Sequence, residues 1–518
     1  MKLNRFFKGA IVLIIFNLIG KILGAVYRIP LAKILGGVGM GQYQLVFPLY
    51  CLILTISTSG MPIAISKLVA EYNSKKQYRS SKKLLFSSIL FLTIISFIGA
   101  FLVVLNAKII SAWQGNSGAY ICYYGIAPAI IFVGVLSAFR GYFQGNLLMF
   151  PTAISGLIEQ IVKIVLGLYL ANKFSVYGTE YAVFGALLGI SISELFAFLF
   201  LFICYLIYSR SQKKLIELET LAQRAVVKEL FHLAVPITLG GLIAPITSML
   251  DSLIVVNLLM FTGYASETAT MLLGLQSGVV EPLVNIPVII SVSIATAMLP
   301  EISKLNITAS KKDVKSLVER AYQITLSISL ACAICFVIFG RQILGFLYSG
   351  SFSPGELTVS LKLLFLGCFN IIFLSLVQVT SSVLQGLNYS KYPVKSLLIG
   401  CGVKLALDFA LIVIPSVNIL GAIISGGACY LTVFILNYKK VKKLTGASLF
   451  SSYFYISIQA SFVSLFAFFA NHLCLIIMGE SSSMFVAGFI TVCMFLITYY
   501  VFFMSEENKY VPENSSSA

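Results

Sequence analysis

Charged side chains within long apolar runs are the residues of this sequence that could do chemistry. The basic ones are Lys21, Lys67, Arg140, Lys163, Lys362 and Lys404. The acidic ones are Glu159, Glu194, Asp251, Glu281 and Asp408. A charge near the centre of a membrane span is costly in lipid and should face a cavity or a partner. Each of these residues is therefore a candidate for a cavity or for a buried ion pair.

Two of the lysines have a carboxylate one helical turn away. Glu159 stands four residues before Lys163, and Asp408 stands four residues after Lys404. Residues four apart lie side by side on a helix, so each pair could form an ion pair. The spacing leaves two interpretations open: neutral pairs that hold helices together, or charges that line a substrate cavity.

Other charges in the runs are ambiguous when taken singly. Lys21 and Arg28 are seven residues, or two turns, apart and therefore share one helical face. Arg28 stands beside Pro30 and could instead reach the outer membrane interface. Arg140 ends the fourth run and could be an interfacial anchor. Glu194 has no partner visible in the sequence, so it is protonated, paired or functional.

Two segments interrupt the helical pattern. Glu281 precedes Pro282, which predicts a helix broken at this point, with freed carbonyls that face a cavity. Glycines cluster at 36–41, which predicts an outer loop that serves as a turn or gate hinge. The cluster lacks the preceding strand and the Gly-Lys-Ser/Thr of a phosphate-binding loop.

The elements that must position these charges are membrane spans. Of the 518 residues, 59% are hydrophobic and 11% are charged, and the mean hydropathy is +0.97. Soluble domains carry about 25% charged residues, so the composition excludes a soluble globular protein and predicts an all-α integral membrane protein. A span needs about 20 apolar residues. The runs predict fourteen spans, at 9–29, 42–68, 84–105, 118–140, 151–172, 182–208, 230–260, 270–301, 317–339, 357–387, 394–414, 419–438, 451–472 and 484–504.

Basic residues of the loops lie almost entirely on one side of the predicted spans. The N-terminal tail and the loops on its side hold 25 Lys and Arg residues, and the opposite loops hold five. Cytoplasmic loops are enriched in Lys and Arg, so we expect both termini in the cytoplasm. The bias also accounts for most of the net charge of +17 without any nucleic acid.

Short motifs recur at a nearly constant offset. Ile-Ser-Lys-Leu at 65–68 returns at 302–305, and Gln-Gly at 144–145 returns at 385–386. Likewise, Lys163 returns as Lys404, which makes the two lysines pseudo-symmetric partners. Spans one to six are therefore expected to match spans seven to twelve as parallel repeats, an arrangement typical of alternating-access transporters.

The spans and their repeat predict five segments along the chain. These are an N-lobe at 1–208, a cytoplasmic amphipathic linker at 209–229, a C-lobe at 230–438, two extra spans within 451–504, and a disordered cytoplasmic tail at 505–518. His232 and His472 are far apart in sequence, and most of the ten Cys are scattered singly, so we expect no metal site.

Several motifs together resemble one known family. They are Arg28–Gly36, Gly41–Gln44, Gly60–Glu71 and Gly141–Asn146, with Pro151, Thr152, Glu159 and Gln160. They are similar to the stage V sporulation protein B family, in the polysaccharide-biosynthesis branch of the multidrug/oligosaccharidyl-lipid/polysaccharide (MOP) flippase superfamily. The resemblance covers nearly the whole chain. It implies a fourteen-helix flippase related to the MurJ lipid II flippases, with two six-helix lobes and a groove lined by the last two helices.

The resemblance also implies a cationic central cavity for a lipid-linked pyrophosphate. Lys21 and Arg28 resemble the basic positions of the family's first helix, with Lys in place of Arg and one residue inserted. The candidate cavity residues are Lys21, Arg28, Arg140, Glu159, Lys163, Glu281 and Lys404. Some relatives bind sodium through carboxylates similar to Asp251 and Asp408, and Glu194 is a further candidate for ion coupling or gating. Here the ammonium of Lys404 could take the place of that cation.

We therefore expect alternating-access flipping of an undecaprenyl-pyrophosphate-linked cell-wall or polysaccharide precursor across the bacterial cytoplasmic membrane. The expected partners are this glycan lipid and membrane lipids, with a monomeric protein, no cofactor, and sodium or proton coupling left open. The rival interpretation is a multidrug cation antiporter of the same superfamily. An enzyme would need an acidic or metal motif that the loops lack, and a transport-free scaffold for spore-envelope assembly is a further alternative.

Overall fold

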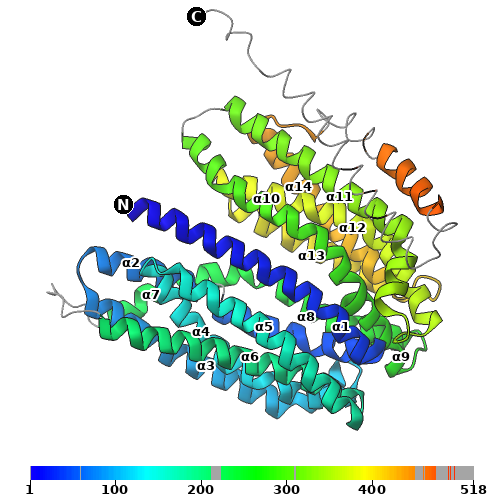
Figure 1. The fold of residues 1–518 in the computed structure, drawn as a ribbon, viewed down its shortest axis with the longest axis horizontal. Coiled ribbons are helices and arrows are strands. Elements are labelled where there is room, and N and C mark those ends of the chain that lie inside the picture. The colour runs from blue at the N-terminus through cyan, green and yellow to red at the C-terminus, as the bar shows by residue number, and fades with distance from the viewer. Residues whose placement is uncertain are drawn as a thin grey trace, which may run out of the picture. The chain divides into compact units, whose positions relative to one another are not determined.

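The structure, a computed structural model, consists of helices joined by short turns (Figure 1). It describes residues 2–58, 60–211, 223–307, 311–449 and 461–473, with 459, 488, 491 and 495. By length and composition, nine segments within these residues could cross a membrane, and no strand occurs among them. This confirms an all-α, multi-pass membrane protein, whereas the count of fourteen spans stays a prediction. The centre of the predicted linker, most of the last predicted span and the tail lie outside the described residues.

The chain divides into two compact units. The first contains the residues up to Val279 together with Ile412–Ile419, and the second contains the rest of the chain from Val280. The predicted N-lobe ends at residue 208, whereas the first compact unit continues through the helices that follow the linker. The predicted lobes of six spans each stay a prediction.

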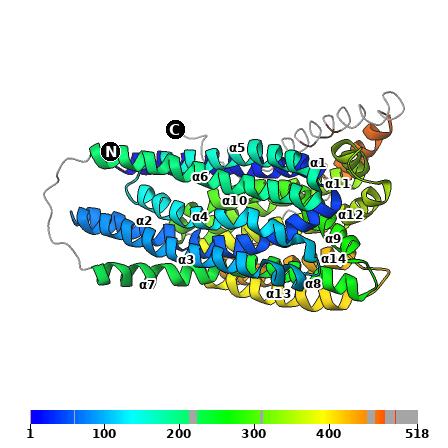
Figure 2. The ribbon, with the colours of Figure 1, turned by 90° about the horizontal axis from the view of Figure 1, so that it is seen from below.

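Helices of the first unit pack mainly on α1 and α4. They are α1 (Lys2–Thr58), α2 (Met61–Ser74), α3 (Tyr78–Trp113), α4 (Tyr120–Gly145), α5 (Met149–Phe174), α6 (Thr179–Ser211), α7 (Gln223–Gly241), α8 (Ile243–Phe261) and α9 (Ser266–Leu273), with short 3-10 turns at Ser117–Ala119 and Ser175–Tyr177. α6 packs on α4 and α5, α4 packs on α3, and α5 packs on α1. Figures 1 and 2 show these long helices side by side along a common direction.

The outer face of α3 shows why these helices need a bilayer. Phe86, Leu90, Phe97 and Phe101 are spaced by four, seven and four residues and are each more than half exposed. Such spacing places them on one stripe of the helix, and a continuous exposed apolar stripe is stable only against lipid. The opposite face of α3 is buried against α4.

α1 is a long helix with one kink. It contains the first predicted span and most of the second, and only Gly36, with φ 65° and ψ −176°, departs from helical geometry. The glycine-rich segment 36–41 is therefore not the outer loop that its composition predicts, because it is helical on both sides of Gly36. A positive φ is accessible to glycine without a steric cost, so Gly36 can bend α1 without ending it.

Helices of the second unit repeat the packing of the first. They are α10 (Glu281–Ile307), α11 (Lys311–Tyr348), α12 (Pro354–Gly386), α13 (Lys391–Leu411) and α14 (Leu420–Thr445). α12 packs on α10, α11 and α14, and α14 packs on α13. In the first unit, α4 likewise packs on α2, α3 and α6, and α6 packs on α5. The repeat in the sequence therefore corresponds to a repeat in which helices pack against one another.

The repeated motifs adopt matching local structure. The turn after Gly145 has its left-handed residue at Leu147, with φ 60°, and the turn after Gly386 has it at Asn388, with φ 68°. Each glycine also packs closely on the repeated Ile-Ser-Lys-Leu motif. A Cβ at Gly145 would lie 2.6 Å from the Ser66 carbonyl oxygen, and one at Gly386 would lie 2.9 Å from Ile302 Cγ2.

The helical break predicted at Glu281 lies immediately before that residue. α9 continues into η3 (Gly274–Val280), a π-helical turn, and α10 begins at Glu281 with Pro282 in its first turn. Proline suits the first turn of a helix because its missing N–H has no partner there in any case. The sequence correctly predicted an irregularity at this point. The irregularity is a wider helical turn and not a break in the helix.

Candidate functional site

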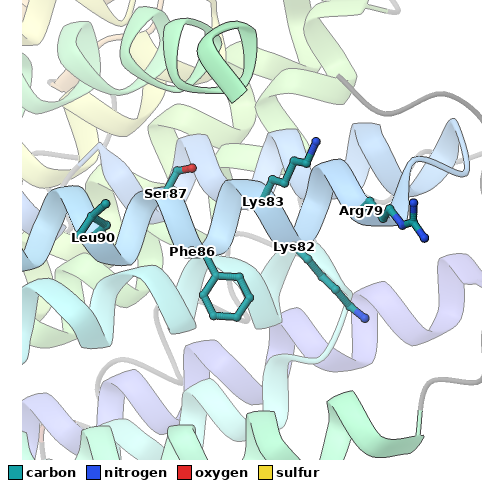
Figure 3. Close-up of a pocket in the computed structure, with 6 residues that line it drawn as sticks. All are labelled: Arg79, Lys82, Lys83, Phe86, Ser87 and Leu90. Carbon is teal, nitrogen blue, oxygen red and sulfur yellow. The ribbon is translucent and has the colours of Figure 1, made fainter. Parts of the chain in front are cut away.

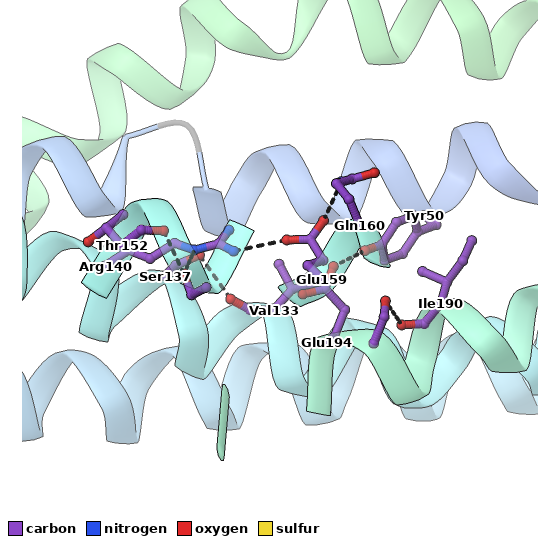
Figure 4. Close-up of polar contacts among 11 residues, drawn as sticks. Tyr50, Val133, Ser137, Arg140, Thr152, Glu159, Gln160, Ile190 and Glu194 are labelled. Carbon is purple, nitrogen blue, oxygen red and sulfur yellow. Dashed lines mark hydrogen bonds and ion pairs between the residues drawn. The ribbon is translucent and has the colours of Figure 1, made fainter. Parts of the chain in front are cut away.

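Four helices of the first unit bring charged residues together. Arg140 on α4 donates from Nη2 to Glu159 Oε2 on α5 at 2.9 Å and from Nε to Ser155 Oγ at 3.3 Å. Figure 4 shows this pair beside a second one, in which the Tyr50 hydroxyl of α1 donates to Glu194 Oε1 of α6 at 3.0 Å. Arg140 is therefore an interhelical ion-pair partner.

Glu194 has a partner that the sequence did not reveal. Its side chain is buried, as is that of Tyr50. Oε2 of Glu194 has no hydrogen-bond partner among the described residues. Glu159, Arg140 and Lys163 all lie within electrostatic range of this carboxyl group. Glu194 thus belongs to the charged cluster of α4 and α5.

Lys163 does not form the predicted ion pair with Glu159. Its ammonium lies 5.8 Å from the centroid of the Tyr27 ring of α1, a cation–π contact. In the part of the chain that the structure describes, no carboxylate lies within ion-pair distance of Lys163. Of the two interpretations that the spacing left open, the neutral pair does not form here, because Arg140 reaches Glu159 from a neighbouring helix.

Arg28 points at the backbone of the π-helical turn. Its Nη1 donates to the Ser277 carbonyl at 3.3 Å, and its guanidinium lies 5.7 Å from the centroid of the Phe47 ring. Gln44 Nε2 donates to the same carbonyl. Among the described residues Arg28 has no carboxylate partner. The contacts of Arg28 are therefore with protein groups of the first unit.

The carbonyls freed near Glu281 were expected to face a cavity. The Ser277 carbonyl instead accepts hydrogen bonds from Arg28 and Gln44, both on α1. Glu281 itself is half-buried at the start of α10.

The second unit contains the other predicted ion pair. Lys404 Nζ lies 2.9 Å from Asp408 Oδ2, and the Ser425 hydroxyl of α14 donates to Asp408 Oδ1. Both charged residues are buried. Both oxygens of Asp408 therefore have partners.

The remaining charged candidates take no part in the contacts described above. Lys21 is exposed on α1, and Asp251 is half-buried on α8. Lys67 and Lys362 are also exposed. The described residues contain no group of three or more His, Cys, Asp or Glu side chains that could hold a metal ion.

Sequence reasoning missed the uncharged partners of the site. Tyr27, Tyr50 and Ser425 each contact a charged candidate. Gln44 instead donates to the Ser277 carbonyl, which also accepts from Arg28. Gln44 lies in one of the motifs that identified the family, but the sequence gave it no function there. A polar residue in an apolar run is a weak signal unless a charged neighbour is already placed beside it.

A basic surface pocket lies away from these charges, at the start of α3. It has a volume of about 370 Å³ and is lined by Arg79, Lys82, Lys83, Phe86, Ser87 and Leu90, which Figure 3 shows along one helix. The basic residues lie in the first turns of α3, within a segment that the sequence predicts as a cytoplasmic loop. The pocket does not include any of the predicted site residues.

Comparison with known proteins identifies the family. A family model described as polysaccharide biosynthesis protein matches residues 6–306, more than half of the chain. The chain belongs to this family. Its first-unit site, with Arg28, Arg140, Glu159, Lys163 and Glu194, lies entirely within the matched residues.

Two relatives from Bacillus subtilis (strain 168) match along most of their length. Stage V sporulation protein B is 27% identical over 456 residues, which cover 87% of this chain and 86% of that protein. Lipid II flippase MurJ is 28% identical over 468 residues, which cover 86% of this chain and 84% of that protein. The predicted resemblance is confirmed.

Solved structures show the same fold. A lipid II flippase MurJ in an inward closed conformation superimposes with a TM-score of 0.73 at 17% identity, covering 96% of this chain and 99% of that one. An inward-facing multidrug resistance MATE family transporter of the MOP superfamily gives 0.64 at 14% identity, covering 83% and 96%. The chain therefore has the fold of these two transporters.

Proposed function

We propose that the protein is a flippase for an undecaprenyl-pyrophosphate-linked precursor of the cell wall or of a polysaccharide. It moves this lipid across the bacterial cytoplasmic membrane by alternating access, with both termini in the cytoplasm. The protein acts as a monomer, uses no cofactor and changes no covalent bond of its substrate. The relatives named stage V sporulation protein B and lipid II flippase MurJ support this assignment.

One observation carries the proposal: two cations of the charged cluster in the first unit, Arg28 and Lys163, have no carboxylate within ion-pair distance among the described residues. Arg140 is neutralised by Glu159 and Lys404 by Asp408. Arg28 and Lys163 contact only a backbone carbonyl and aromatic rings. Lys163 lies within electrostatic range of Arg28, and also of the carboxylates of Glu159 and Glu194. Like charges repel strongly at low dielectric, so an anion between or beside them would be stabilising.

A lipid-linked pyrophosphate has the matching chemistry. Its two phosphates offer several oxygens to Arg and Lys, which form short charge-assisted hydrogen bonds with phosphate. Its polyprenyl chain can stay in the lipid while the head group is moved. A cationic drug would instead be repelled by Arg28 and Lys163, which favours the anionic lipid over the drug.

Multidrug cation antiport is the second candidate. The likeness to a MATE family transporter supports it at the level of the superfamily fold, and the buried carboxyl group of Glu194 could serve cation exchange. This alternative predicts drug efflux that is lost in Glu281→Gln or Asp251→Asn. The flippase proposal predicts no such efflux.

The test is accumulation of the lipid-linked precursor at the inner leaflet of depleted cells. Cells that lack this protein and any related flippase are complemented with wild type, Arg28→Ala, Lys163→Ala or Lys362→Ala. We expect wild type and Lys362→Ala to clear the precursor, because Lys362 is exposed and lies outside the cluster. Arg28→Ala and Lys163→Ala should fail although they reach the membrane. Clearance by both variants, or no accumulation on depletion, would contradict the proposal.

A further inference from the structure

The π-helical turn leaves one backbone carbonyl without its usual donor. In a π-helix the carbonyl of residue i accepts from the N–H of residue i+5. For Ser277, in η3, this residue is Pro282, which has no N–H. The Ser277 carbonyl therefore depends on side-chain donors, and the structure supplies two of them, Arg28 and Gln44.

Glycine contacts hold this turn against α1. A Cβ at Gly274 would overlap the Gly37 carbonyl oxygen, and a Cβ at Gly41 would overlap the Thr270 carbonyl oxygen. A Cβ at Gly278 would lie 2.8 Å from Met40 Cε. Small residues let two helix backbones approach closely. The kinked part of α1 and the π-helical turn are thus packed backbone to backbone, which keeps the Ser277 carbonyl within reach of both donors.

The two donors differ in what else they can bind. Arg28 is a cation that the proposed function assigns to the substrate's pyrophosphate. Gln44 is neutral, buried and without net charge to offer a phosphate. If Arg28 were the sole donor, its movement to the substrate would leave the Ser277 carbonyl without a hydrogen bond. An unpaired buried carbonyl is unfavourable. Because Gln44 also donates, the carbonyl keeps a partner when Arg28 leaves.

We propose that Gln44 is a positioning residue of the flippase, which holds the Ser277 carbonyl so that the Arg28 guanidinium is released to the substrate's pyrophosphate. This inference rests on the proposed function. Gln44 does not touch the substrate itself. Its effect passes through Arg28 and depends on Pro282, which removes the backbone donor.

This dependence gives a test by rescue. Gln44→Met keeps the length of the side chain and removes the donor, so the carbonyl retains Arg28. Pro282→Ala supplies the missing N–H at residue 282, which can donate to the Ser277 carbonyl. The probe is undecaprenyl pyrophosphate, and its binding is measured with the full-length protein in lipid nanodiscs. The variants are Gln44→Met, Pro282→Ala, the double variant and Arg28→Ala.

We expect Gln44→Met to weaken binding on the order of tenfold, the size of one unmade buried hydrogen bond. Pro282→Ala should bind at least as tightly as wild type, and the double variant should regain most of the loss. A merely structural defect at Gln44 would not be repaired by a change at Pro282. Binding by Gln44→Met equal to wild type, or a double variant as weak as Gln44→Met, would overturn the inference.

The same binding measurements test the proposed function separately from this inference. If wild type does not bind the probe, or binds it as well as Arg28→Ala does, the pyrophosphate assignment is wrong. If wild type binds and Arg28→Ala does not, the assignment stands whatever Gln44→Met shows. Unfolding temperatures of all four variants identify any variant that is misfolded, and Gln44→Asn, whose shorter amide cannot reach the carbonyl, then replaces Gln44→Met.

Discussion

The guanidinium of Arg140 on α4 lies 2.9 Å from the carboxylate of Glu159 on α5. The side chains are 23% and 19% exposed, so the pair is largely removed from solvent. Glu159 is also the carboxylate that stands one turn from Lys163 on its own helix. Because Arg140 neutralises Glu159 across the helix interface, Lys163 is left as a cation without a carboxylate partner among the described residues.

Removing one partner of this ion pair should destabilise the protein more than replacing both partners with apolar residues. Removing one partner of a buried ion pair destabilises by about 3–5 kcal/mol, whereas apolar replacement of both is often neutral. We expect Arg140→Met to lower the stability by about 3 kcal/mol and Arg140→Met/Glu159→Leu to recover most of it. Thermal unfolding in detergent measures both effects.

The control for this prediction is an exposed ion pair. Lys75 and Glu71 lie 2.7 Å apart with side chains 57% and 43% exposed, and such pairs contribute about 0–1 kcal/mol. Lys75→Met should therefore have little effect. Strictly additive losses for Arg140 and Glu159 would show that the two residues are not coupled.

Sodium should not be needed for transport. The Lys404 ammonium lies 2.9 Å from Asp408 Oδ2, and Ser425 donates to the other oxygen, so a cation already neutralises this carboxylate. We expect replacement of sodium by potassium in a vesicle flipping assay to leave the rate unchanged. Lys404→Ala should be the variant that acquires a sodium response. A wild-type rate that falls when sodium is removed would count against this assignment of the cation's place.

The contact between α1 and α9 should not tolerate a methyl group. A Cβ at Gly41 would overlap the Thr270 carbonyl, whereas nothing lies within 4 Å of a Cβ at Gly156 on α5. Gly41→Ala should destabilise by about 1–3 kcal/mol through overpacking. Gly156→Ala should be neutral or stabilising by up to about 1 kcal/mol, because alanine favours a helix. Equal unfolding temperatures for the two variants would contradict this reading of the close approach.

The Tyr50 hydroxyl should stabilise the protein through its hydrogen bond to Glu194. Glu194 is 3% exposed, and Tyr50 is its hydrogen-bond donor. Tyr50→Phe removes this donor from a buried carboxyl group, so we expect a loss of about 1–3 kcal/mol in stability. In Tyr50→Phe/Glu194→Leu the loss should largely disappear, because no unpaired oxygen is left. Chemical denaturation of the purified protein distinguishes the two variants, and an equal loss in both would exclude the coupling.

Loop charge predicts the membrane orientation. Fluorescent-protein and alkaline phosphatase fusions after Gln77 should report the cytoplasm, and fusions after Val176 should report the outside. The first site lies in a loop rich in Lys and Arg, and the second lies in one with few. Fusions that report the reverse would refute cytoplasmic termini.

The sequence by itself determined the class of the protein, its repeat and its family. Composition and apolar runs depend only on residue type, and motifs such as Ile-Ser-Lys-Leu at 65–68 and 302–305 are visible without coordinates. It also predicted the Lys404–Asp408 pair, because both residues lie on one helix and i, i+4 geometry is local. The irregularity before Pro282 was local for the same reason.

Only the tertiary structure decided which charges are neutralised and which are available. The partner of Glu159 comes from another helix, as do the partners of Glu194 and of the Ser277 carbonyl. Helix packing sets these distances, and periodicity along one helix says nothing about them. The glycines at 36–41 show the same limit: glycine permits a loop, a kink or a close helix contact, and the neighbouring helix decides among them.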